Sequence, residues 1–280
     1  MYQDASSQKK IAVLGDLTGY GRCALTVSLP ILSAHGFQTC PVPTAVLSNH
    51  TAFESFFMVD TTPKLPSYFN EWEKLSLTFD GILTGFLGSS RQVDLVLDFI
   101  HRFKKESCIV VVDPVMGDNG TAYQTCTKTY CREMKKLVKL ADILTPNLTE
   151  ACLLADIPYK EAFTEKELFS LAQKLLCRAD QKLVITGIPK KDRIGSFYAV
   201  QTACGITGGL FTNKKIAGLR CGTGDVFSSL IAADALLNKD FATSVKSAGR
   251  FIRKCLIASD EQSIPPENGV CFEQFLQIRR

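Results

Sequence analysis

The chain carries the stretch Gly218-Leu-Arg-Cys-Gly-Thr-Gly-Asp-Val-Phe-Ser-Ser-Leu230, in which glycines gather just before an apolar segment with helical spacing. The backbone N–H groups of Gly222, Thr223 and Gly224, with the positive end of the following helix dipole, suit the charge that builds on a phosphoryl group during transfer. One carboxylate, Asp225, stands at the junction, where it can serve as a base beside that anion. A plain N-cap after a tight turn explains the same residues and is, for this stretch alone, the commoner arrangement.

The composition fits an α/β domain that can bury a large core. The chain has 280 residues, of which 46% are hydrophobic, and we expect one domain over residues 10–280 after a flexible N-terminus at residues 1–9. Lys and Arg number 32 against 28 Asp and Glu, a net charge of +4 without a dense basic block. This weakly favours an anionic small molecule as ligand and does not indicate nucleic acid. The polar start and the lack of an apolar run of bilayer length predict a cytoplasmic protein with no membrane contact.

The eleven cysteines, an odd number at irregular spacing, are expected to be free thiols, many of them buried. Cys108 and Cys152, for example, each precede a run of apolar residues. No pair has the CxxC spacing and the three histidines are scattered, so a zinc cluster is not supported. A reducing compartment fits this pattern.

Short β-rich apolar runs alternate with longer amphipathic segments along the chain. The runs are apolar with little alternation, which predicts strands covered on both faces. Their order predicts a three-layer α/β fold, with a mainly parallel, doubly wound sheet between two layers of helices. We expect strands at 11–15, 44–47, 81–84, 108–113, 142–145, 183–186 and 196–200. We expect helices at 22–35, 91–105, 128–140, 147–155, 164–179, 224–238 and 241–257, and an ordinary surface loop from Asp60 to Pro66.

Polar residues and glycines recur where the expected strands end. In doubly wound sheets, ligands bind beyond the carboxyl ends of the strands. Each short motif is also explained by a helix cap or a turn, but six of them at one edge favour a ligand site there. They are Gly15-Asp16, Ser48-Asn-His-Thr51, Thr84-Gly85, Asp113-Pro114, Thr145-Pro-Asn147 and Thr186-Gly187.

The segment Asp113-Pro-Val-Met-Gly-Asp-Asn-Gly120 places two carboxylates, Asp113 and Asp118, beside two glycines. Hard oxygen ligands next to a mobile loop suit a magnesium nucleotide, because Mg²⁺ keeps several waters and takes only one or two protein carboxylates. The alternative is an Asp-Pro turn followed by a surface loop. The loop that runs on to Cys126 can instead act as a lid that excludes water.

The segment Thr145-Pro-Asn-Leu-Thr-Glu150 predicts a strand end, a turn fixed by Pro146 and a helix start. Asn147 and Glu150 have the spacing of a capping box, and the same oxygens can also hold magnesium-bound water. The chain has no GxxxxGK[ST] motif and no GxGxxG after its first strand, so neither a P-loop nor a Rossmann dinucleotide site is supported.

Five of these segments together resemble the pyridoxal kinases of the ribokinase-like superfamily, especially the bacterial pyridoxamine/pyridoxal kinases. The resemblance runs from about Lys10 to the last helix and implies a ribokinase-like three-layer fold with no separate lid domain. The segment Gly222-Thr-Gly-Asp225 marks the superfamily, whereas two others narrow the resemblance to the vitamin B6 branch. These are Ser48-Asn-His-Thr51 and Asp113-Pro-Val-Met-Gly-Asp118; the remaining two are Gly15-Asp-Leu-Thr-Gly-Tyr-Gly-Arg22 and Thr145-Pro-Asn-Leu-Thr-Glu150.

The resemblance implies an ATP-dependent kinase that phosphorylates the 5′-hydroxymethyl group of a B6 vitamer. Asp225 would then be the general base, and the N–H groups of Gly222, Thr223 and Gly224 would bind the transferring phosphoryl group. The implied nucleotide residues are Asp118, Tyr123, Asn147, Thr186 and Gly187. The implied cation residues are Asp113 and Glu150 for Mg²⁺, with Thr145 and Thr186 at positions that line a region for K⁺ and phosphate.

The implied vitamer contacts include two departures from the family pattern. Phe86 stands where many relatives carry a tyrosine, and Asp16 stands where several carry a serine, so the preference among pyridoxal, pyridoxine and pyridoxamine is left open. Cys221 directly precedes the anion site, where packing explains it more simply than covalent chemistry on the vitamin aldehyde. The implied contacts are Asp16, Tyr20, Ser48, His50, Thr51, Phe86 and Cys221.

Three other functions compete with this one. A hydroxymethylpyrimidine kinase belongs to a sister branch with the same chemistry, although the 48–51 segment favours a vitamer. A vitamin-binding protein without turnover has no need of Asp225 and Asp113. A sugar or nucleoside kinase would carry an inserted lid, for which the segment between Gly15 and Thr51 is too short and too helical. Some relatives are homodimers, and the stretch from Ala24 to Leu32 is a candidate interface, although apolar helix positions more often belong to the core.

Overall fold

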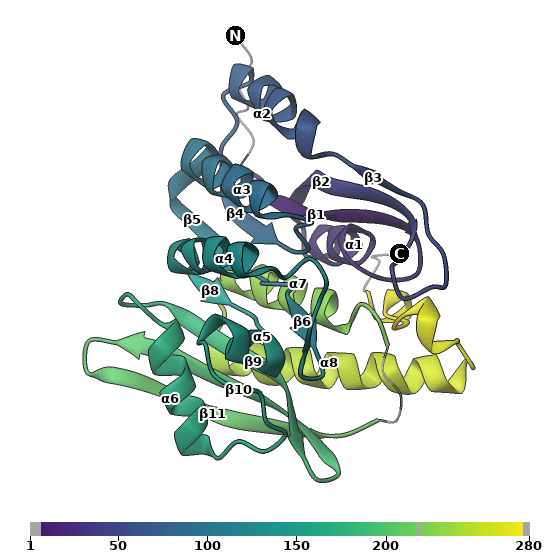
Figure 1. Cartoon of the computed structure of the whole chain (residues 1–280), viewed down its shortest axis with the longest axis vertical. Coiled ribbons are helices and arrows are strands. Elements are labelled where there is room, and N and C mark those ends of the chain that lie inside the picture. Colours follow the sequence, from purple (N-terminus) through teal and green to yellow (C-terminus); the bar gives the residue numbers. More distant parts are fainter. Residues whose placement is uncertain (1–6, 217, 219, 277–280) are drawn as a thin grey trace.

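A nine-stranded sheet runs through the computed structural model, which describes residues 7–216, 218 and 220–276 (Figure 1). The strand order is β11-β10-β9-β8-β5-β4-β1-β2-β3. The strands from β9 to β2 in this order pair in parallel, and β3 at one end and β10 and β11 at the other pair antiparallel. The bounds are Lys10–Tyr20 (β1), Gln38–Asn49 (β2), Met58–Asp60 (β3), Phe79–Thr84 (β4), Lys104–Val112 (β5), Ile143–Leu144 (β8), Lys182–Lys190 (β9), Arg193–Thr202 (β10) and Gly205–Lys214 (β11). A separate hairpin pairs β6 (Gly117–Asp118) with β7 (Thr121–Ala122).

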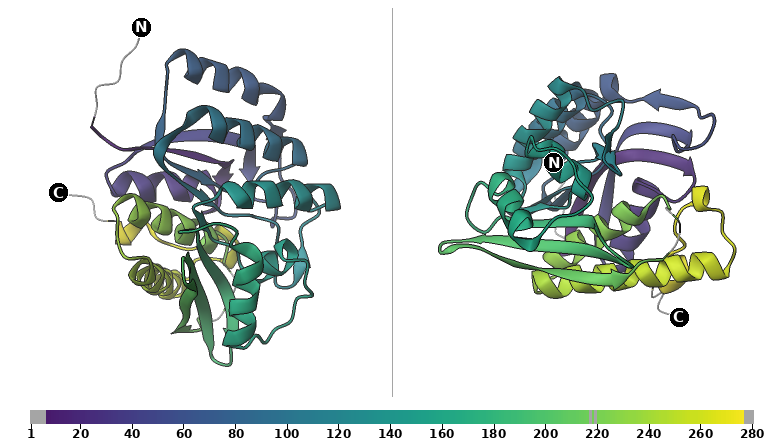
Figure 2. Two further views of the ribbon diagram at one scale, coloured as in Figure 1. Left: turned by 90° about the vertical axis from the view of Figure 1, so that its left-hand side faces the viewer. Right: turned by 60° about the horizontal axis from the view of Figure 1, so that its bottom comes forward.

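Helices cover both faces of the sheet, which gives the expected three layers (Figure 2). One layer holds α1 (Leu25–Ala34), α7 (Thr223–Leu236) and α8 (Phe241–Glu261); the other holds α2 (Leu65–Lys74), α3 (Ser90–Phe103), α4 (Lys128–Leu140), α5 (Leu148–Leu154) and α6 (Glu165–Leu175). Within the described ranges, no helix has the length and apolarity that crossing a membrane requires. Residues 1–6 of the expected flexible N-terminus lie outside the described part of the chain.

The central strands are apolar on both sides because each side faces a helical layer. In β1, Ala12 and Leu14 pack into the core under α2 to α6, whereas Ile11 and Val13 pack into the core under α1, α7 and α8. The strands β4, β5, β8 and β9 alternate between the same two cores. Each fully buried Val, Leu or Ile contributes about 1.5–3 kcal/mol relative to exposure, so both helical layers are tied firmly to the sheet.

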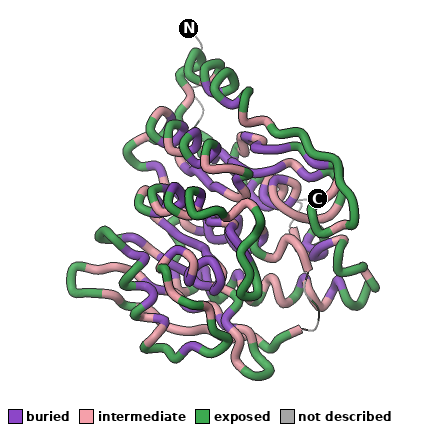
Figure 3. Tube along the Cα trace, in the orientation of Figure 1, coloured by how far each residue is buried: buried purple, intermediate pink, exposed green. Residues whose placement is uncertain are grey.

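Two expectations about the N-terminal third are wrong. The segment between Gly15 and Thr51 is mainly extended, because β1 and β2 stay paired as far as Tyr20 and Asn49, after a register shift at Gly15. The stretch Asp60–Pro66 is not a loop but holds the end of β3, a 3₁₀ turn and the start of α2. Its prolines stand in the first turns of these helices, where the missing N–H has no intrahelical role. The segment around β3 is exposed (Figure 3).

The other predicted strands and helices are confirmed, with shifted ends. The largest shifts are at β1, β2, β5 and β9, which are longer than expected, at α6, which already ends at Leu175, and at α8, which continues to Glu261. The sequence analysis missed β11, the β6–β7 hairpin, β3 and α2. Glycines at three positions of β11 lower its strand propensity, and the hairpin strands have only two residues each.

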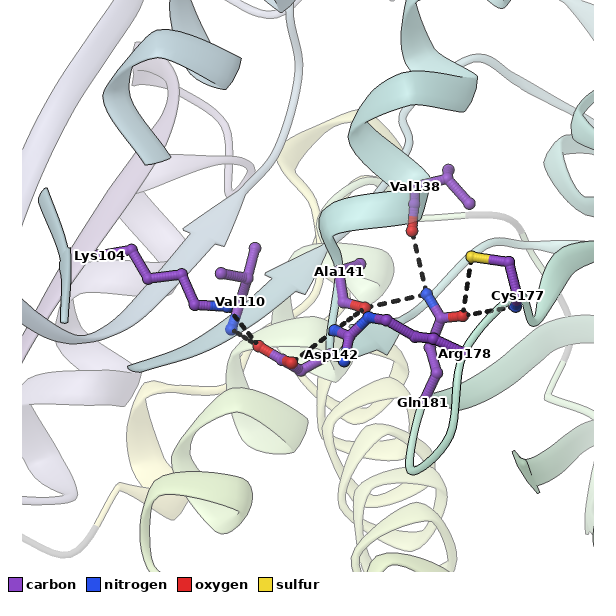
Figure 4. A network of polar contacts seen from close by, with 8 residues as sticks. All are labelled: Lys104, Val110, Val138, Ala141, Asp142, Cys177, Arg178 and Gln181. Atoms are coloured by element: carbon purple, nitrogen blue, oxygen red, sulfur yellow. Dashed lines mark hydrogen bonds and ion pairs between the residues drawn. The ribbon is translucent and has the colours of Figure 1, made fainter. Parts of the chain in front are cut away.

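A polar network fixes β8 against β5 (Figure 4). Asp142, which directly precedes β8, accepts a hydrogen bond from the Val110 N–H at 2.7 Å. The same carboxylate pairs with Arg178 at 2.5 Å and with Lys104 at 3.5 Å. The short strand β8 therefore has its position set by side-chain contacts as well as by its few ladder bonds.

A buried glutamine completes this network. Gln181 has no exposed surface, and its amide N–H₂ donates to the carbonyls of Val138 and Ala141 at 3.0 and 2.9 Å. Its oxygen accepts from the Cys177 N–H at 2.8 Å (Figure 4). The end of α4 and the turn after α6 are thus joined by one side chain.

We predict that Gln181→Met, which keeps the volume and removes the amide, lowers the free energy of unfolding by about 1–3 kcal/mol, because it leaves buried backbone groups with fewer partners. Urea denaturation measures this. The matched control is Gln201→Met, since the Gln201 amide contacts only the neighbouring Thr202 carbonyl, and we expect a change within about 0.5 kcal/mol. Equal effects of the two substitutions would contradict the structural role of Gln181.

Candidate active site

The first turn of α7 leaves backbone N–H groups available to an anion. Gly222 is the N-cap, with φ 82°, and a Cβ at this position would lie 2.1 Å from the Arg22 carbonyl oxygen. Only glycine fits such a close approach in a left-handed conformation. Gly222 has no side chain, so the N-cap offers no oxygen to accept hydrogen bonds from the first N–H groups of the helix. The N–H groups of Thr223 and Gly224 therefore point from the positive end of the helix dipole without a capping side chain. Of the stretch quoted first, Leu219 lies outside the described residues.

Asp225 stands in this first turn as a desolvated carboxylate. Its pKa is raised to about 6: burial is the main cause, the backbone N–H of Ala24 donates to the carboxylate and acts in the opposite direction, and the nearby carboxylate of Asp16 adds to the rise. Ala24 has φ 51° and ψ −132°, a strained conformation for a residue with a Cβ. The chain thus accepts local strain where its backbone contacts Asp225.

Asp113 and Glu150 continue this row of buried carboxylates. Asp113 follows β5 and Glu150 lies in the first turn of α5; only 8% and 4% of their surfaces are exposed. Burial raises the pKa of Asp113 to about 7, with Asp225 as the second cause. Burial and then Asp113 raise the pKa of Glu150. Such a row of desolvated negative charges favours a cation beside it. Among the described residues, no three acidic, histidine or cysteine side chains are grouped closely enough to hold a metal ion directly.

The expected capping box at the start of α5 is confirmed, and it also anchors the neighbouring hairpin. Asn147 accepts from the Glu150 N–H at 2.9 Å and Glu150 accepts from the Asn147 N–H at 2.8 Å. The second Glu150 oxygen accepts from the Met116 N–H at 3.1 Å, and the Asn147 amide donates to the Gly117 carbonyl at 2.8 Å. The capping residues therefore hold the root of the β6–β7 hairpin.

The β6–β7 hairpin carries Asp118 and Tyr123 beside the carboxylate row. Both side chains are exposed at the surface, and the Gly120 N–H at the tip donates to Thr149 at 2.8 Å. Partial burial of the Tyr123 hydroxyl raises its pKa, and Asp118 and Glu150 are the next causes. Tyr123 thus lies in the field of these carboxylates, on the segment expected to act as a lid.

Asp16, His50 and Cys221 form a second group of polar residues beside Asp225. Asp16 is buried, accepts a hydrogen bond from the Thr18 hydroxyl at 2.6 Å, and has its pKa raised by burial. His50 Nε2 donates to the Glu267 carbonyl at 2.6 Å, which leaves Nδ1 as an acceptor. The Cys221 thiol lies 3.9 Å from His50 Nδ1.

The C-terminal segment closes this side of the site. The Cys221 carbonyl accepts from the Val270 N–H at 3.2 Å. Arg220, whose side chain is 6% exposed, donates to the Ile264 and Pro265 carbonyls. Arg22 forms a backbone bridge with Gly269. The glycine loop is thus held between the start and the end of the chain.

Several predicted residues lie at the same sheet edge without a described contact to this row. Ser48 instead fixes the β2–β3 turn, because its hydroxyl donates to Asn49 and accepts from the Phe57 N–H. Tyr20 is 56% exposed and its ring lies 5.8 Å from that of Phe53. Thr145 is buried, Thr51 is exposed and Phe86 is half-buried. Thr186 and Gly187 lie within β9, where Thr186 forms a backbone bridge with Asn147.

The sequence analysis missed residues that act through the backbone. Ala24 and Glu267 contribute an N–H and a carbonyl, for which side-chain identity gives no signal. The Ser228 hydroxyl donates to the Gly224 carbonyl at 3.0 Å and lies near the Asp113 carboxylate, whose pKa it lowers; its position three residues after Asp225, on the same helix face, could have indicated it. The Thr84 hydroxyl is buried beside Asp225 and has no hydrogen-bond partner among the described residues.

Comparisons with known proteins identify the family. A family described as phosphomethylpyrimidine kinase matches residues 32–269. A candidate phosphomethylpyrimidine kinase from Bacteroides thetaiotaomicron is 37% identical and superposes with a TM-score of 0.91 over 99% of this chain and 97% of that one. Its second crystal form, with pyridoxal, gives 35% identity and a TM-score of 0.87 over 96% and 94% of the two chains.

Relatives that are named as pyridoxal kinases also match over most of their length. The pyridoxine/pyridoxal/pyridoxamine kinase of Bordetella avium is 26% identical over 85% of this chain and 81% of its own. The pyridoxal kinase of Lactobacillus plantarum is 28% identical and has a TM-score of 0.89 over 97% and 96% of the two chains. The chain is therefore a member of the phosphomethylpyrimidine kinase family and groups with the pyridoxal kinases of the ribokinase-like superfamily.

Proposed function

We propose that this protein is an ATP-dependent kinase that phosphorylates the 5′-hydroxymethyl group of vitamin B6: pyridoxal, pyridoxine or pyridoxamine. The observation that carries the proposal is the position of Asp225, a desolvated carboxylate in the same helix turn as the free N–H groups of Thr223 and Gly224. A base and an anion site in one turn are what phosphoryl transfer to an alcohol needs. The other functional residues are assigned around this pair.

Asp225 takes the proton of the vitamer hydroxyl as its oxygen attacks the γ-phosphorus of ATP. Its pKa of about 6 leaves it ionised at neutral pH, yet basic enough to accept a proton. The N–H groups of Gly222, Thr223 and Gly224 hold the transferring group and stabilise its charge, which is most of the catalytic task in phosphoryl transfer. Asp118 and Tyr123 on the hairpin, with Asn147, Thr186 and Gly187, bind the nucleotide, and closure of the hairpin excludes water.

Asp113 and Glu150 suit Mg²⁺, because burial raises the pKa of both carboxyl groups and nearby carboxylates raise it too, Asp225 for Asp113 and Asp113 for Glu150; a divalent cation relieves this repulsion. When bound, Mg²⁺ neutralises the phosphate oxygens of ATP and helps to align them. The two residues would hold it largely through water, since both Glu150 oxygens already accept backbone N–H groups. Thr145 and Thr186 are assigned to a K⁺ and phosphate region.

The vitamer lies on the Asp16 side of Asp225. Asp16 and His50 offer polar contacts, Phe86 offers a ring face, and Cys221 packs beside them; Tyr20, Ser48 and Thr51 belong to the rim. Two observations favour a vitamer over a hydroxymethylpyrimidine: the Ser48-Asn-His-Thr51 segment, and the pyridoxal in a relative that is 35% identical. A cytoplasmic location and a homodimer remain part of the proposal. The apolar residues of the stretch from Ala24 to Leu32 do not supply the dimer interface, because Leu25, Val27, Ile31 and Leu32 are buried in the core of the chain.

We predict that Asp225→Asn lowers kcat on B6 vitamers by about 10²–10⁴-fold, because it removes the base and keeps the shape. Coupled ADP release with Mg-ATP measures turnover on the three vitamers and on hydroxymethylpyrimidine. The matched control is Asp240→Asn at the start of α8, which keeps an N-cap far from the site, and we expect its turnover to stay near that of the unchanged chain. Activity on the pyrimidine alone would support the sister branch, and vitamer binding without turnover would support a carrier.

We predict that kcat/KM rises with pH through an acidic limb with a midpoint at or below about 6. The pKa of Asp225 is raised to about 6, so the base is protonated and inactive below that pH and ionised above it. A Mg²⁺ ion nearby favours the ionised form and can only move the midpoint down. Residual turnover of Asp225→Asn should lack this limb; an unchanged limb in the variant would assign it to another group.

We predict that Asp113→Asn stabilises the protein at pH 8 by about 1–3 kcal/mol while abolishing most turnover. The folded-state pKa of Asp113, about 7, lies above its ordinary value of 3.8, so the stability that the protonated form contributes is lost as pH rises through 7. Urea denaturation without nucleotide at pH 8 and pH 5 measures this, with a smaller gain expected at pH 5. Asp94→Asn, on an exposed face of α3, is the control, and destabilisation by Asp113→Asn at pH 8 would contradict the prediction.

A further inference from the structure

Two cysteines next to the hairpin lie within reach of a covalent bond. Cys126 Sγ and Cys131 Sγ are 3.0 Å apart, and a disulfide bond of about 2.05 Å requires only about 1 Å of further approach. Both side chains are half-buried, so an oxidant can reach them. By contrast, Cys255 and Cys271 are both buried in the α8 region.

The start of α4 holds the two sulfur atoms together. Thr127 is the N-cap, and its hydroxyl accepts from the Tyr130 N–H. Cys126 is therefore the residue before the cap and Cys131 the fourth helical residue, the two positions that ordinarily form a hydrophobic staple. Because helical side chains lean toward the N-terminus, the Cys131 sulfur is directed at Cys126. The pair is set by helix geometry and not by a chance approach of loops.

The surroundings give the two thiols different roles. Burial raises the pKa of Cys126 to about 12, and its hydrogen bond with Cys131 is the second cause, so Cys126 keeps its proton. Cys131 is the sulfur that the peroxide oxidises first, and its backbone N–H is bonded to the Thr127 carbonyl at 2.9 Å in the first turns of α4. The neighbouring hydroxyls of Thr125 and Tyr130 are buried and have no hydrogen-bond partner among the described residues, so neither competes for the sulfur atoms in this structure.

We propose that Cys126 and Cys131 form a redox modification site that hydrogen peroxide converts to an intramolecular disulfide. The Cys131 thiol gives its proton to the solvent and its sulfur attacks one peroxide oxygen; the O–O bond breaks, and the hydroxide that leaves takes up a proton, so that a sulfenic acid and water form. The Cys126 sulfur then attacks the Cys131 sulfur, the S–O bond breaks, and the hydroxyl group leaves as water with the Cys126 proton. Both thiols together lose two electrons, and the peroxide becomes two waters.

The disulfide would restrain the hairpin. The chain that enters the hairpin, its first root, is held by the contacts of Met116 and Gly117 with the α5 capping box. The chain that leaves the hairpin, its second root, is held by two hydrogen bonds of 2.9 Å. The Tyr123 N–H donates to the Met116 carbonyl, and the Cys126 N–H donates to the Tyr123 carbonyl. A covalent bond from Cys126 to α4 fixes this second root, so opening of residues 117–125 becomes slower. This inference does not depend on which substrate the enzyme uses.

Peptide mapping of the full chain tests the proposal. Trypsin cuts after Lys105, Lys128 and Arg132, which places Cys126 and Cys131 in separate peptides, 106–128 and 129–132. After hydrogen peroxide treatment and alkylation of the remaining thiols, we expect a linked pair of these peptides that dithiothreitol separates. Oxidation of the exposed Cys177 and Cys204 with Cys126 and Cys131 still alkylated would overturn the proposal.

A matched pair of variants identifies the sulfur atoms, because peptide 106–128 also contains Cys108. The linked peptides should persist in Cys108→Ser and disappear in Cys126→Ser; the reverse would overturn the assignment. Hydrogen exchange then tests the restraint, with exchange of residues 117–125 expected to be slower by roughly threefold or more in the oxidised chain. Equal exchange in oxidised and reduced chains would overturn the restraint.

Discussion

Burial of the central strands on both faces is the constraint from which the site follows. A parallel sheet between two helical layers has no free face, so it can present polar groups only at the ends of its strands. Asp16 in the second half of β1 and the residues after β4, β5 and β8 therefore gather at one edge, and α7 begins at the same edge with its dipole directed there. Asp16, Asp113 and Asp225 come from distant parts of the sequence but share this edge because the strands share one direction.

The carboxylates at this edge are present although their surroundings disfavour the ionised form. Burial raises the pKa of each of Asp16, Asp113, Glu150 and Asp225, and neighbours in the row add to the effect in three of them. Among the described residues, none of the four takes part in an ion pair; the described pairs lie elsewhere, as at Asp142 and Arg178. Such groups are common where function opposes stability. The neutralising charge is expected from the cation that accompanies the nucleotide.

Much of this architecture could be predicted from the sequence, because the same physical signals recur in many elements. The second half of β5, residues 108–112, is apolar without interruption, and the α5 start has the spacing of a capping box, so both are visible without coordinates. The failures have physical reasons too. The prolines before α2 suggested a loop but stand in first turns, and the glycines of β11 hide a strand that is held by pairing with β10.

The site was predictable only where side chains carry it. Asp225, Asp113 and Glu150 could be found because carboxylates after strands and before helices are conspicuous. The Ala24 N–H and the Glu267 carbonyl could not, since any residue supplies these groups and only the path of the chain selects them. The same holds for Ser48, whose hydroxyl fixes a turn although its position suggested a ligand contact.

Residues 264–270 pack against Arg22, His50 and Cys221, which has a consequence for folding during synthesis on the ribosome. The glycine loop takes contacts from a segment translated after it, including the Val270 N–H on the Cys221 carbonyl. A ribosome-bound chain can assemble most of the sheet before this segment emerges. The contacts around the glycine loop are therefore completed only after residues 264–270 have left the exit tunnel.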